Sequence, residues 1–315
     1  MLVVQNINFS YLETAVIQNI SFEALPGQNI AILGESGCGK STLVKLIYGL
    51  LDLSSGSIFF NDIETFGPKM NLVSGHPEMK YLAQDFDLMP FTTVAENVGQ
   101  FLSNINLEKK KARIHELLET VEMTEFVNTK TRFLSGGQMQ RVAIAKVLAN
   151  EPKLLLLDEP FSHIDNFKKN ALRRNLFAYL KNQNITCIVA THDSTDALSF
   201  SDKTIVIQNG KIIQNDLSQN IYNNPANKYV GSLFGEISEI PQNVFIPTFR
   251  KDELLLCYPH QLKISENGTL KVNVRKCYFK GSHFLVKAVY EKRIVFFESE
   301  TELLFNQEIS LEYKK

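Results

Sequence analysis

A glycine-rich loop constrains the fold of this chain more than any other feature. It reads Gly34-Glu-Ser-Gly-Cys-Gly-Lys-Ser-Thr42, with the spacing GxxxxGKS, and lies between an apolar run at 30–33 and a helix-like stretch at 43–51. Glycines permit backbone angles closed to other residues, so the turn can point its N–H groups inward around an anion. A helix starting there adds free N–H groups and the positive end of its dipole. The spacing predicts a loop that binds the phosphates of a nucleoside triphosphate.

Side chains of this loop have expected roles of their own. Lys40 is expected to reach the β- and γ-phosphates, and the hydroxyl of Ser41 is expected to ligate Mg²⁺. Cys38 is interpreted as a tolerated small residue, and the nearby helix N-terminus is expected to lower the pKa of its thiol. The residues expected to hold the nucleotide are Gly34, Glu35, Ser36, Gly37, Cys38, Gly39, Lys40, Ser41 and Thr42.

A continuous apolar run that ends in two acids narrows the chemistry. Residues 154–157 are all leucine, which is the pattern of a strand buried on both faces, and Asp158 and Glu159 follow directly. At the end of such a strand Asp158 would hold Mg²⁺ through water, and Glu159 would polarise an attacking water. The pair predicts hydrolysis of the bound triphosphate.

The segment Leu134-Ser-Gly-Gly-Gln138 precedes a stretch with the apolar periodicity of a helix. Its serine and glutamine have the spacing of a capping box. Its two glycines leave the helix N-terminus bare, so backbone N–H groups can approach a phosphate. Because a cap alone does not need both glycines, we expect a second phosphate contact here.

Composition limits the classes of partner. The 315 residues are 44% apolar and 21% charged, as in ordinary globular chains of one large or two unequal domains. A net charge of −1 gives no basic field for nucleic acid, and no nucleic-acid partner is expected. No apolar stretch has the length of a membrane span, and the start lacks the pattern of a signal peptide. Four scattered cysteines are interpreted as reduced thiols. Membrane contact is therefore expected only through a partner.

Two regions differ in their periodicity. Short strands over residues 1–30 and apolar runs at 154–157, 185–190 and 204–207 alternate with helical patterns, which predicts a parallel α/β sheet. Residues 67–80 have no periodicity and are expected to form a loop. From Gly235 onward strands alternate apolar and polar residues between glycine turns, without a long helical segment. This tail is expected to be a separate small β barrel.

Over residues 1–230 the chain resembles the ATP-binding subunits of ABC transporters. LSGGQ is the signature of that family, and here it continues without a gap as LSGGQMQRVAIAKVLANEPKLLLLDEP. The resemblance implies a P-loop NTPase fold, with a RecA-like core, an antiparallel β subdomain and a helical subdomain at about 86–150. It implies a domain over residues 1–232, followed by an all-β, OB-like domain over 236–315.

The resemblance implies further site residues. Tyr11 corresponds to the aromatic residue that stacks on adenine, Gln84 to the glutamine that senses Mg²⁺ and water, and His192 to the switch histidine near the γ-phosphate. Ser162, His163 and Asp165 correspond to the D-loop at the dimer interface, although the family more often has Ala-Leu at 163–164. The implied catalytic residues are Glu159, His192 and Gln84; the implied Mg²⁺ ligands are Ser41, Gln84 and, through water, Asp158; the implied contacts to the ATP of a partner protomer are Leu134, Ser135, Gly136, Gly137 and Gln138.

The family resemblance also implies partners. Two subunits, either a homodimer or a pair of ABC subunits, would face each other head to tail with two Mg-ATP between them. The segment around Gln84 would contact integral membrane permease subunits, with an external solute-binding protein completing the transporter. The implied location is peripheral, at the cytoplasmic face of a bacterial inner membrane.

The β-rich tail favours an importer. It resembles the OB-like module, often called TOBE, in importer subunits for polyamines, ferric iron, sulfate, molybdate and maltose, and Tyr258-Pro-His-Gln-Leu262 resembles one of its motifs. Among these solutes the overall resemblance favours polyamine or ferric iron, and the tail is interpreted as support for the dimer, with ligand sensing as the alternative. An ATPase subunit of a lipid or lipoprotein exporter and a soluble ABC-type ATPase are the alternatives.

Overall fold

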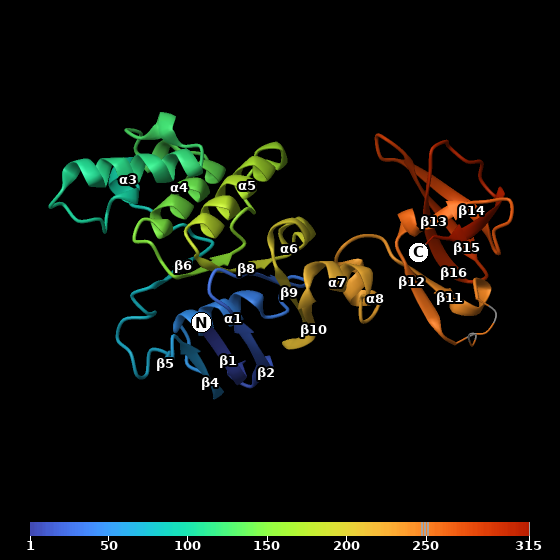
Figure 1. Ribbon diagram of the computed structural model, residues 1–315, viewed down its shortest axis with the longest axis horizontal. Helices are drawn as coiled ribbons and strands as arrows, with labels where there is room; N and C mark the ends of the chain where they lie inside the picture. The colour runs from blue at the N-terminus through green and yellow to red at the C-terminus, as the bar shows by residue number, and fades with distance from the viewer. Residues whose placement is uncertain (247, 249, 251, 315) are drawn as a thin grey trace. The chain divides into compact units, whose positions relative to one another are not determined.

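The computed structural model describes residues 1–246, 248, 250 and 252–314. Contacts within the chain define two compact units, Met1–Gln219 and Asn220–Lys315 (Figure 1). The units divide between residues 219 and 220, earlier in the chain than the domain boundary expected at 232–236. That boundary between functional domains stays a prediction. Among the described residues, no helix combines the length and the apolar character needed to cross a bilayer.

The first unit is built around a six-stranded sheet with the order β10-β9-β3-β8-β7-β6. Neighbours from β9 to β6 are parallel, and β10 is antiparallel to β9 at one edge. The strands are β3 (Asn29–Leu33), β6 (Met79–Leu82), β7 (Leu154–Asp158), β8 (Thr186–Thr191), β9 (Lys203–Gln208) and β10 (Lys211–Leu217). The expected parallel α/β sheet is confirmed.

The leucine run of β7 explains why this sheet is covered on both faces. Leu155 and Leu157 belong to an apolar cluster with the helices α3, α4 and α5, whereas Leu154 and Leu156 belong to a second cluster with α1, β1 and β2. Successive side chains of a strand point to opposite faces, so an unbroken apolar strand needs two apolar layers. Figure 1 shows the helices α3 to α5 on one side of the sheet and α1 with β1, β2 and β4 on the other.

A four-stranded antiparallel sheet, with the order β2-β1-β4-β5, forms the layer next to α1. Its strands are β1 (Leu2–Tyr11), β2 (Thr14–Ala24), β4 (Ser55–Phe60) and β5 (Ile63–Glu64). The turn between β1 and β2 falls at residues 12–13. One expectation was too broad, because β6 begins at Met79, within the stretch expected to be a loop. With only four residues, β6 is too short for a periodic pattern.

The helices of the first unit have clear boundaries. They are α1 (Lys40–Tyr48), α2 (Val94–Val98), α3 (Leu107–Thr120), α4 (Gly136–Leu148), α5 (Asn166–Asn182) and α6 (Ser194–Phe200), with 3₁₀ turns η1 (Thr124–Phe126) and η2 (Thr131–Phe133). Helix α7 (Ser218–Asn223) includes the point where the two units divide. Apolar residues of α3, α4 and α5 meet in one cluster, so the segment carrying the LSGGQ pentapeptide is anchored to the sheet.

The second unit is a curled antiparallel sheet with the order β13-β17-β14-β15-β16, and its end strands β13 and β16 are in contact. The elements are α8 (Lys228–Ser232), β11 (Ser238–Pro241), η3 (Gln242–Val244), β12 (Leu254–Cys257), η4 (Pro259–Gln261), β13 (Leu262–Ile264), β14 (Leu270–Phe279), β15 (Phe284–Tyr290), β16 (Arg293–Ser299) and β17 (Glu308–Tyr313). One core encloses the inward residues of β14, including Val272 and Val274. A P-loop core followed by an all-β, OB-like module is confirmed.

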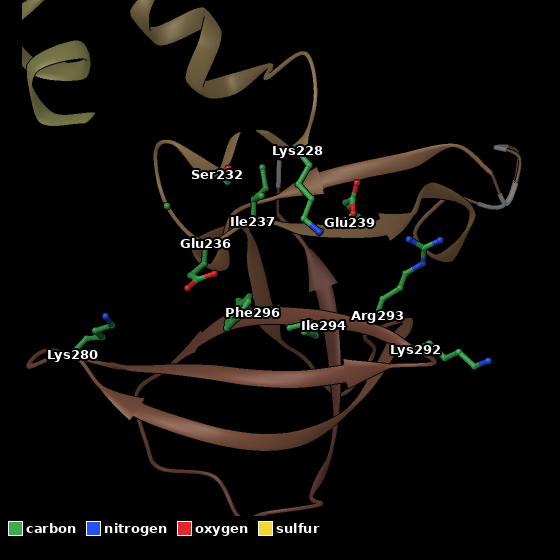
Figure 2. Close-up of a pocket in the computed structure, with 11 residues that line it drawn as sticks. Lys228, Ser232, Glu236, Ile237, Glu239, Lys280, Lys292, Arg293, Ile294 and Phe296 are labelled. Carbon is green, nitrogen blue, oxygen red and sulfur yellow. Dashed lines mark hydrogen bonds and ion pairs between the residues drawn. The ribbon is translucent and has the colours of Figure 1, made fainter. Parts of the chain in front are cut away.

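This second unit contains a cavity of about 820 Å³ beside strand β16. Figure 2 shows the apolar side chains of Ile294 and Phe296 on one wall and Lys228 and Glu239 on the other. The ammonium of Lys228 lies 2.9 Å from the carboxylate of Glu239. None of the residues expected at a catalytic site lines this cavity.

Candidate active site

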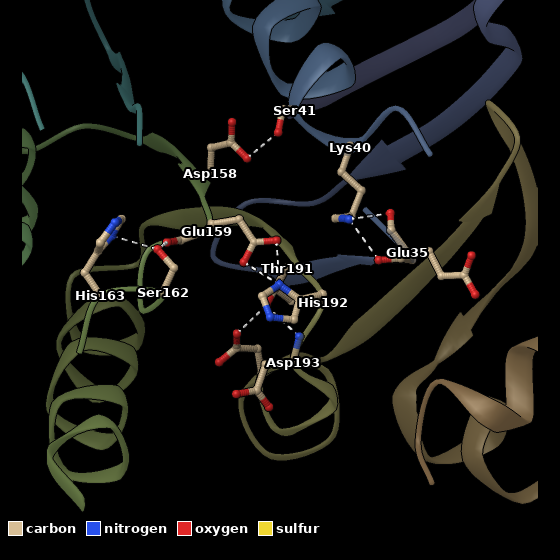
Figure 3. Close-up of polar contacts among 12 residues, drawn as sticks. Glu35, Lys40, Ser41, Asp158, Glu159, Ser162, His163, Thr191, His192 and Asp193 are labelled. Atoms are coloured by element: carbon tan, nitrogen blue, oxygen red, sulfur yellow. Dashed lines mark hydrogen bonds and ion pairs between the residues drawn. The ribbon is translucent and has the colours of Figure 1, made fainter. Parts of the chain in front are cut away.

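The phosphate loop connects the end of β3 to α1, as the spacing predicts. Gly37 and Gly39 have φ angles of 81° and 109°, in the left-handed region that favours glycine. Gly39 caps α1 without a side-chain hydrogen bond, so the first N–H groups of the helix are left to other acceptors. The ammonium of Lys40 donates to the carbonyl oxygens of Gly34 (2.8 Å) and Glu35 (2.9 Å) across the loop (Figure 3). The loop therefore has the geometry of an anion nest, with the Lys40 ammonium inside it.

Cys38 does not behave as expected. A Cβ added to Gly34 would meet the Cys38 sulfur at 2.7 Å, so the thiol points back into the loop. Cys38 is 9% exposed and belongs to the apolar cluster beneath β2 and α1. Burial raises the pKa of this thiol, and Lys40 only partly offsets the effect. The expected lowering of the pKa was wrong, because the direction of the side chain outweighs the nearby helix end.

Ser41 and Asp158 come together from α1 and from the end of β7. The Ser41 hydroxyl donates to a carboxylate oxygen of Asp158 at 2.8 Å (Figure 3). Asp158 is 3% exposed, and burial raises its pKa although the Ser41 hydrogen bond opposes the shift. A hydroxyl and a buried carboxylate are oxygen donors that suit Mg²⁺, and a bound cation would relieve the cost of burying this charge. The residues present therefore fit the metal that the family uses.

Glu159 follows Asp158 in an unusual backbone conformation. Its φ angle is 51°, which is uncommon for a residue with a side chain and occurs where surrounding structure imposes it. The carboxylate lies 2.8 Å from Nδ1 of His192, which follows β8 (Figure 3). An ionised carboxylate only accepts hydrogen bonds, so with Glu159 ionised Nδ1–H is the donor of this bond. The two side chains form a hydrogen-bonded pair beside the phosphate loop.

Several of these groups share one cavity of about 380 Å³. Tyr11 lines this cavity; it is 46% exposed and lies edge-on to Phe9, with ring centroids 4.7 Å apart. Gln84, which follows β6, also lines it. The complete lining is Tyr11, Val16, Ser36, Gly37, Gly39, Lys40, Ser41, Thr42, Gln84 and Glu159. The structure thus brings the Tyr11 ring, the anion nest of the phosphate loop, the Glu159 carboxylate and the Gln84 amide together at one site.

The signature segment begins α4, away from this cavity's lining. Ser135 and Gln138 form the predicted capping box, in which the Gln138 N–H donates to the Ser135 hydroxyl and the Ser135 N–H to the Gln138 side chain. Leu134 is buried, and Gly136 and Gly137 form the first turn. The capping box is therefore confirmed, and within this chain the pentapeptide does not reach the phosphate loop.

The D-loop segment follows Glu159 directly. The Ser162 hydroxyl contacts Nδ1 of His163 at 3.0 Å and donates to the carbonyl oxygen of Glu159 at 3.0 Å. The His163 ring packs edge-on against Phe86, with centroids 5.2 Å apart. Asp165 is the N-cap residue of α5 and makes no side-chain cap hydrogen bond.

An ionic network behind His192 was missed from the sequence. Arg173 on α5 is 3% exposed and contacts Asp193 (2.6 Å) and Asp196 (2.7 Å), the residues that follow His192 and begin α6. Burial raises the pKa of Asp196 to about 6, while hydrogen bonds from Thr191 and Arg173 oppose the shift. Arg173 shares the apolar face of α5 with Leu176, three positions on, and a charge on such a face is a signal that a partner is buried there.

Two other contacts were missed because they join distant segments. The Tyr81 hydroxyl on β6 lies 3.5 Å from Asp158, and burial raises the pKa of this tyrosine. The Gln140 amide on α4 reaches the backbone of Glu159 and His163. Neither contact joins residues at a characteristic spacing in the sequence, so no motif predicts it.

Comparison with known proteins places the chain in a family. The sequence profile of the ABC transporter family matches residues 17–162. The Fe(3+) ions import ATP-binding protein FbpC 2 of Haemophilus influenzae is 32% identical over 304 residues, covering 89% of this chain and 85% of that protein. The Fe(3+) ions import ATP-binding protein FbpC of Mannheimia succiniciproducens is 34% identical over 239 residues, covering 75% and 67%.

Solved structures give a consistent picture. The dimeric post-hydrolysis state of the ATP-binding cassette MJ0796, bound to ADP and Pi, has a TM-score of 0.61 and 27% identity, and covers 69% of this chain and 99% of that one. Clostridium perfringens cbiO1, part of the ABC transporter complex cbiONQ, has a TM-score of 0.63 and 29% identity, covering 78% and 96%. The chain belongs to the ATP-binding proteins of ABC transporters, which bind ATP with Mg²⁺ and hydrolyse it.

Proposed function

We propose that this chain is the ATPase subunit of an importer for ferric iron. The observation that carries the proposal is the 304-residue similarity to an iron-import protein, which extends over 89% of the chain and so beyond the ATPase unit. The ATPase motifs do not choose the solute, because the other subunits of a transporter do. Similarity that extends over both units is therefore stronger support than similarity over these motifs alone.

Nucleotide binding is assigned to the 380 Å³ cavity. The ring of Tyr11 would stack on adenine, a contact that needs only an exposed aromatic face. The backbone N–H groups of 34–41 would surround the phosphates, and Lys40 would exchange its two carbonyl contacts for phosphate oxygens. Ser41, Asp158 and Gln84 would hold Mg²⁺, Asp158 through water. Bound Mg²⁺ would neutralise charge that develops on the phosphates.

Hydrolysis is assigned to Glu159 and His192. The Glu159 carboxylate would orient a water and accept its proton as the water oxygen bonds to the γ-phosphorus and the bond to the β-phosphate oxygen breaks. His192 would hold this carboxylate through Nδ1, 2.8 Å away, and Nε2 would donate to the γ-phosphate when the ring carries both protons. Burial of Glu159, whose side chain is 14% exposed, strengthens both interactions.

A head-to-tail dimer would complete each site. The signature residues Leu134, Ser135, Gly136, Gly137 and Gln138 would contact the ATP of a partner protomer, and the D-loop residues Ser162, His163 and Asp165 would meet the partner at the interface. The dimeric cassette MJ0796 supports this assembly. Because each ATP bridges two protomers, it binds the closed state better, and its hydrolysis reopens the dimer.

The remaining partners follow from the proposed transport. Permease subunits would contact the segment around Gln84, and an external binding protein would deliver the iron. The chain would then be peripheral, at the cytoplasmic face of a bacterial inner membrane. The OB-like unit is proposed to support the dimer.

Uptake of radiolabelled solutes tests the proposal. Source cells that lack this chain should lose ferric iron uptake, and the wild-type chain, but not an equally abundant Lys40→Ala variant, should restore it. Polyamine uptake in the same cells should be unchanged. Iron uptake that does not depend on the chain, or polyamine uptake that does, would overturn the assignment of the solute.

A further inference from the structure

The amide of Gln140 connects the signature helix to the residues around the catalytic carboxylate. Gln140 lies on α4 and is 1% exposed. Its Nε2 donates to the carbonyl oxygen of Glu159 at 3.0 Å and contacts the Ser162 hydroxyl at 3.4 Å. Its Oε1 accepts from the backbone N–H of His163 at 3.0 Å. A single buried side chain therefore bonds to both ends of the segment 159–163.

The backbone of Glu159 is held from two directions. Its N–H donates to the carbonyl oxygen of Ala190 at 2.9 Å, and its carbonyl oxygen accepts from Gln140 and from Ser162. With φ at 51°, this residue needs such support, because an unsupported side-chain-bearing residue favours negative φ. Loss of the Gln140 donor would leave the Glu159 carbonyl held by Ser162 alone, which would let the carboxylate turn away from His192.

The first turn of α4 also contacts the D-loop closely. A Cβ added to Gly137 would lie 2.8 Å from the carbonyl oxygen of His163, so this signature position needs glycine for packing within the chain. The edge-on contact between His163 and Phe86 brings in the segment after Gln84. Three segments thus meet at His163, whose backbone Gln140 holds: the signature turn, the D-loop and the segment that follows β6.

We propose that Gln140 is a positioning residue that fixes Glu159 and the D-loop to the signature helix of the same chain. This rests on the proposed role of Glu159 in hydrolysis. In the head-to-tail dimer the signature contacts the partner's ATP, whereas Glu159 serves the ATP held by its own chain. Gln140 therefore lies between the signature helix, which would serve one ATP, and the carboxylate, which would serve the other.

The test compares Gln140→Met with a matched loss of a buried amide elsewhere. Methionine has a similar length and high helix propensity but cannot form these hydrogen bonds. The control is Asn97→Leu, since Asn97 is fully buried and bonds to Met89, Thr92 and Thr93 but not to the segment 159–163. For the full-length protein we would measure Tm, ATP affinity, and kcat and KM for Mg-ATP.

Gln140→Met should lower kcat by roughly 10- to 100-fold, the cost of a small displacement of a catalytic group, with KM and ATP affinity within about threefold of wild type. Asn97→Leu should lose at least as much Tm while keeping wild-type kcat. A folded Gln140→Met protein with wild-type kcat would overturn the proposal, and so would an equal loss of kcat in the control. A wild-type chain without Mg-ATP turnover would instead overturn the proposed function.

Gln140→Glu supplies a second readout that does not depend on how well the methionine variant folds. An ionised carboxylate can still accept from the His163 N–H but cannot donate to the Glu159 carbonyl, whereas a protonated one can do both. Burial raises the pKa of such a carboxyl into an accessible range. The turnover of this variant, divided by that of wild type, should therefore rise as pH falls from 8 to 6. A ratio that does not change with pH would contradict the positioning role.

Discussion

The two units differ in how the polar groups around their cavities are arranged as well as in the size of those cavities. The cavity of the second unit, at about 820 Å³, is more than twice the size of the nucleotide cavity, at about 380 Å³. Around the smaller one, polar groups from β3, α1, β7 and β8 meet at hydrogen-bond distance. Around the larger one, an ion pair between Lys228 and Glu239 lies on one wall, and both side chains are partly exposed. Convergent polar groups on rigid elements, and not volume, mark the catalytic site.

Buried polar side chains show the same contrast. Those of the first unit include Lys40, Gln140, Asp158, Arg173 and Asp196, all with charges or amides near the site. Among the described residues of the second unit, the buried polar side chains other than tyrosine are Ser238 and Ser299, which bond to nearby backbone groups. Burying a charge is costly unless a function or a partner compensates. This contrast favours a supporting role for the second unit. Four predictions test the difference between the two units.

The largest effect is expected from Arg173→Met, which removes the partner of two carboxylates in the first unit. Breaking a buried ion pair costs about 3–5 kcal/mol. Because the folded-state pKa of Asp196 is raised to about 6, its protonated form favours folding; this stabilisation is complete below the ordinary pKa of 3.8 and is lost as pH rises through 6. Without Arg173 that pKa rises further, so the loss should be greater at pH 8 than at pH 5.

Urea unfolding at both pH values measures this effect, with Arg174→Met, on the exposed side of the same helix, as control. A loss of stability that is the same at pH 5 and pH 8 would show that Asp196 does not carry it.

Substitution of one lysine beside each cavity tests directly whether the two cavities differ in their contribution to ATP turnover. Lys40→Ala should lower ATP turnover by roughly 10²- to 10³-fold, as expected when a donor to a developing charge is lost. Lys292→Ala, at the rim of the larger cavity, should leave turnover unchanged. Steady-state kinetics on both full-length variants decides the comparison, and equal losses would contradict it.

Tyr11→Ala should weaken ATP binding by about 5- to 150-fold, because stacking on a base contributes roughly 1–3 kcal/mol. Tyr11→Phe should bind almost normally, and GTP should be affected like ATP. Titration with nucleotide and the Tm of the nucleotide-free protein are measured on the same variants. Lower apo stability with unchanged affinity would mean that Tyr11 only packs against Phe9.

The smallest effect is expected from removal of the tail. A chain that ends near Gly235 keeps the whole first unit, so it should stay folded and bind nucleotide with an affinity within a few-fold of the full-length protein, because every motif of the nucleotide site lies upstream. Weaker dimerisation is the expected defect. An insoluble or nucleotide-blind product would show that the two units depend on one core.

Sequence alone located the groups that are neighbours along the chain. The phosphate loop, the acids after β7 and the capping box of α4 are local patterns, each set by backbone geometry. Contacts such as Gln140 with Glu159, or Arg173 with Asp196, depend on how helices pack on the sheet and have no spacing of their own. Cys38 shows the same limit, since proximity to a helix end did not reveal that its side chain points inward.

In the C-terminal unit, too, only the longer local patterns predicted the structure. Alternation in β14 and β15 predicted strands and a barrel-like fold, because one face of each strand is buried. The short strands β11, β12 and β13 were not predicted, because three or four residues carry too little periodicity. Which solute or partner this unit serves is not encoded in such a pattern.

Glu159→Gln tests the central claim, that the site in the first unit hydrolyses ATP held between two chains. The substitution removes the proposed base but leaves the phosphate loop and the Ser41–Asp158 pair in place. Light scattering and nucleotide counting on the full-length variant in excess Mg-ATP should show a stable dimer with one ATP per protomer, and turnover should almost vanish. A monomeric variant that hydrolyses ATP at the wild-type rate would contradict the account.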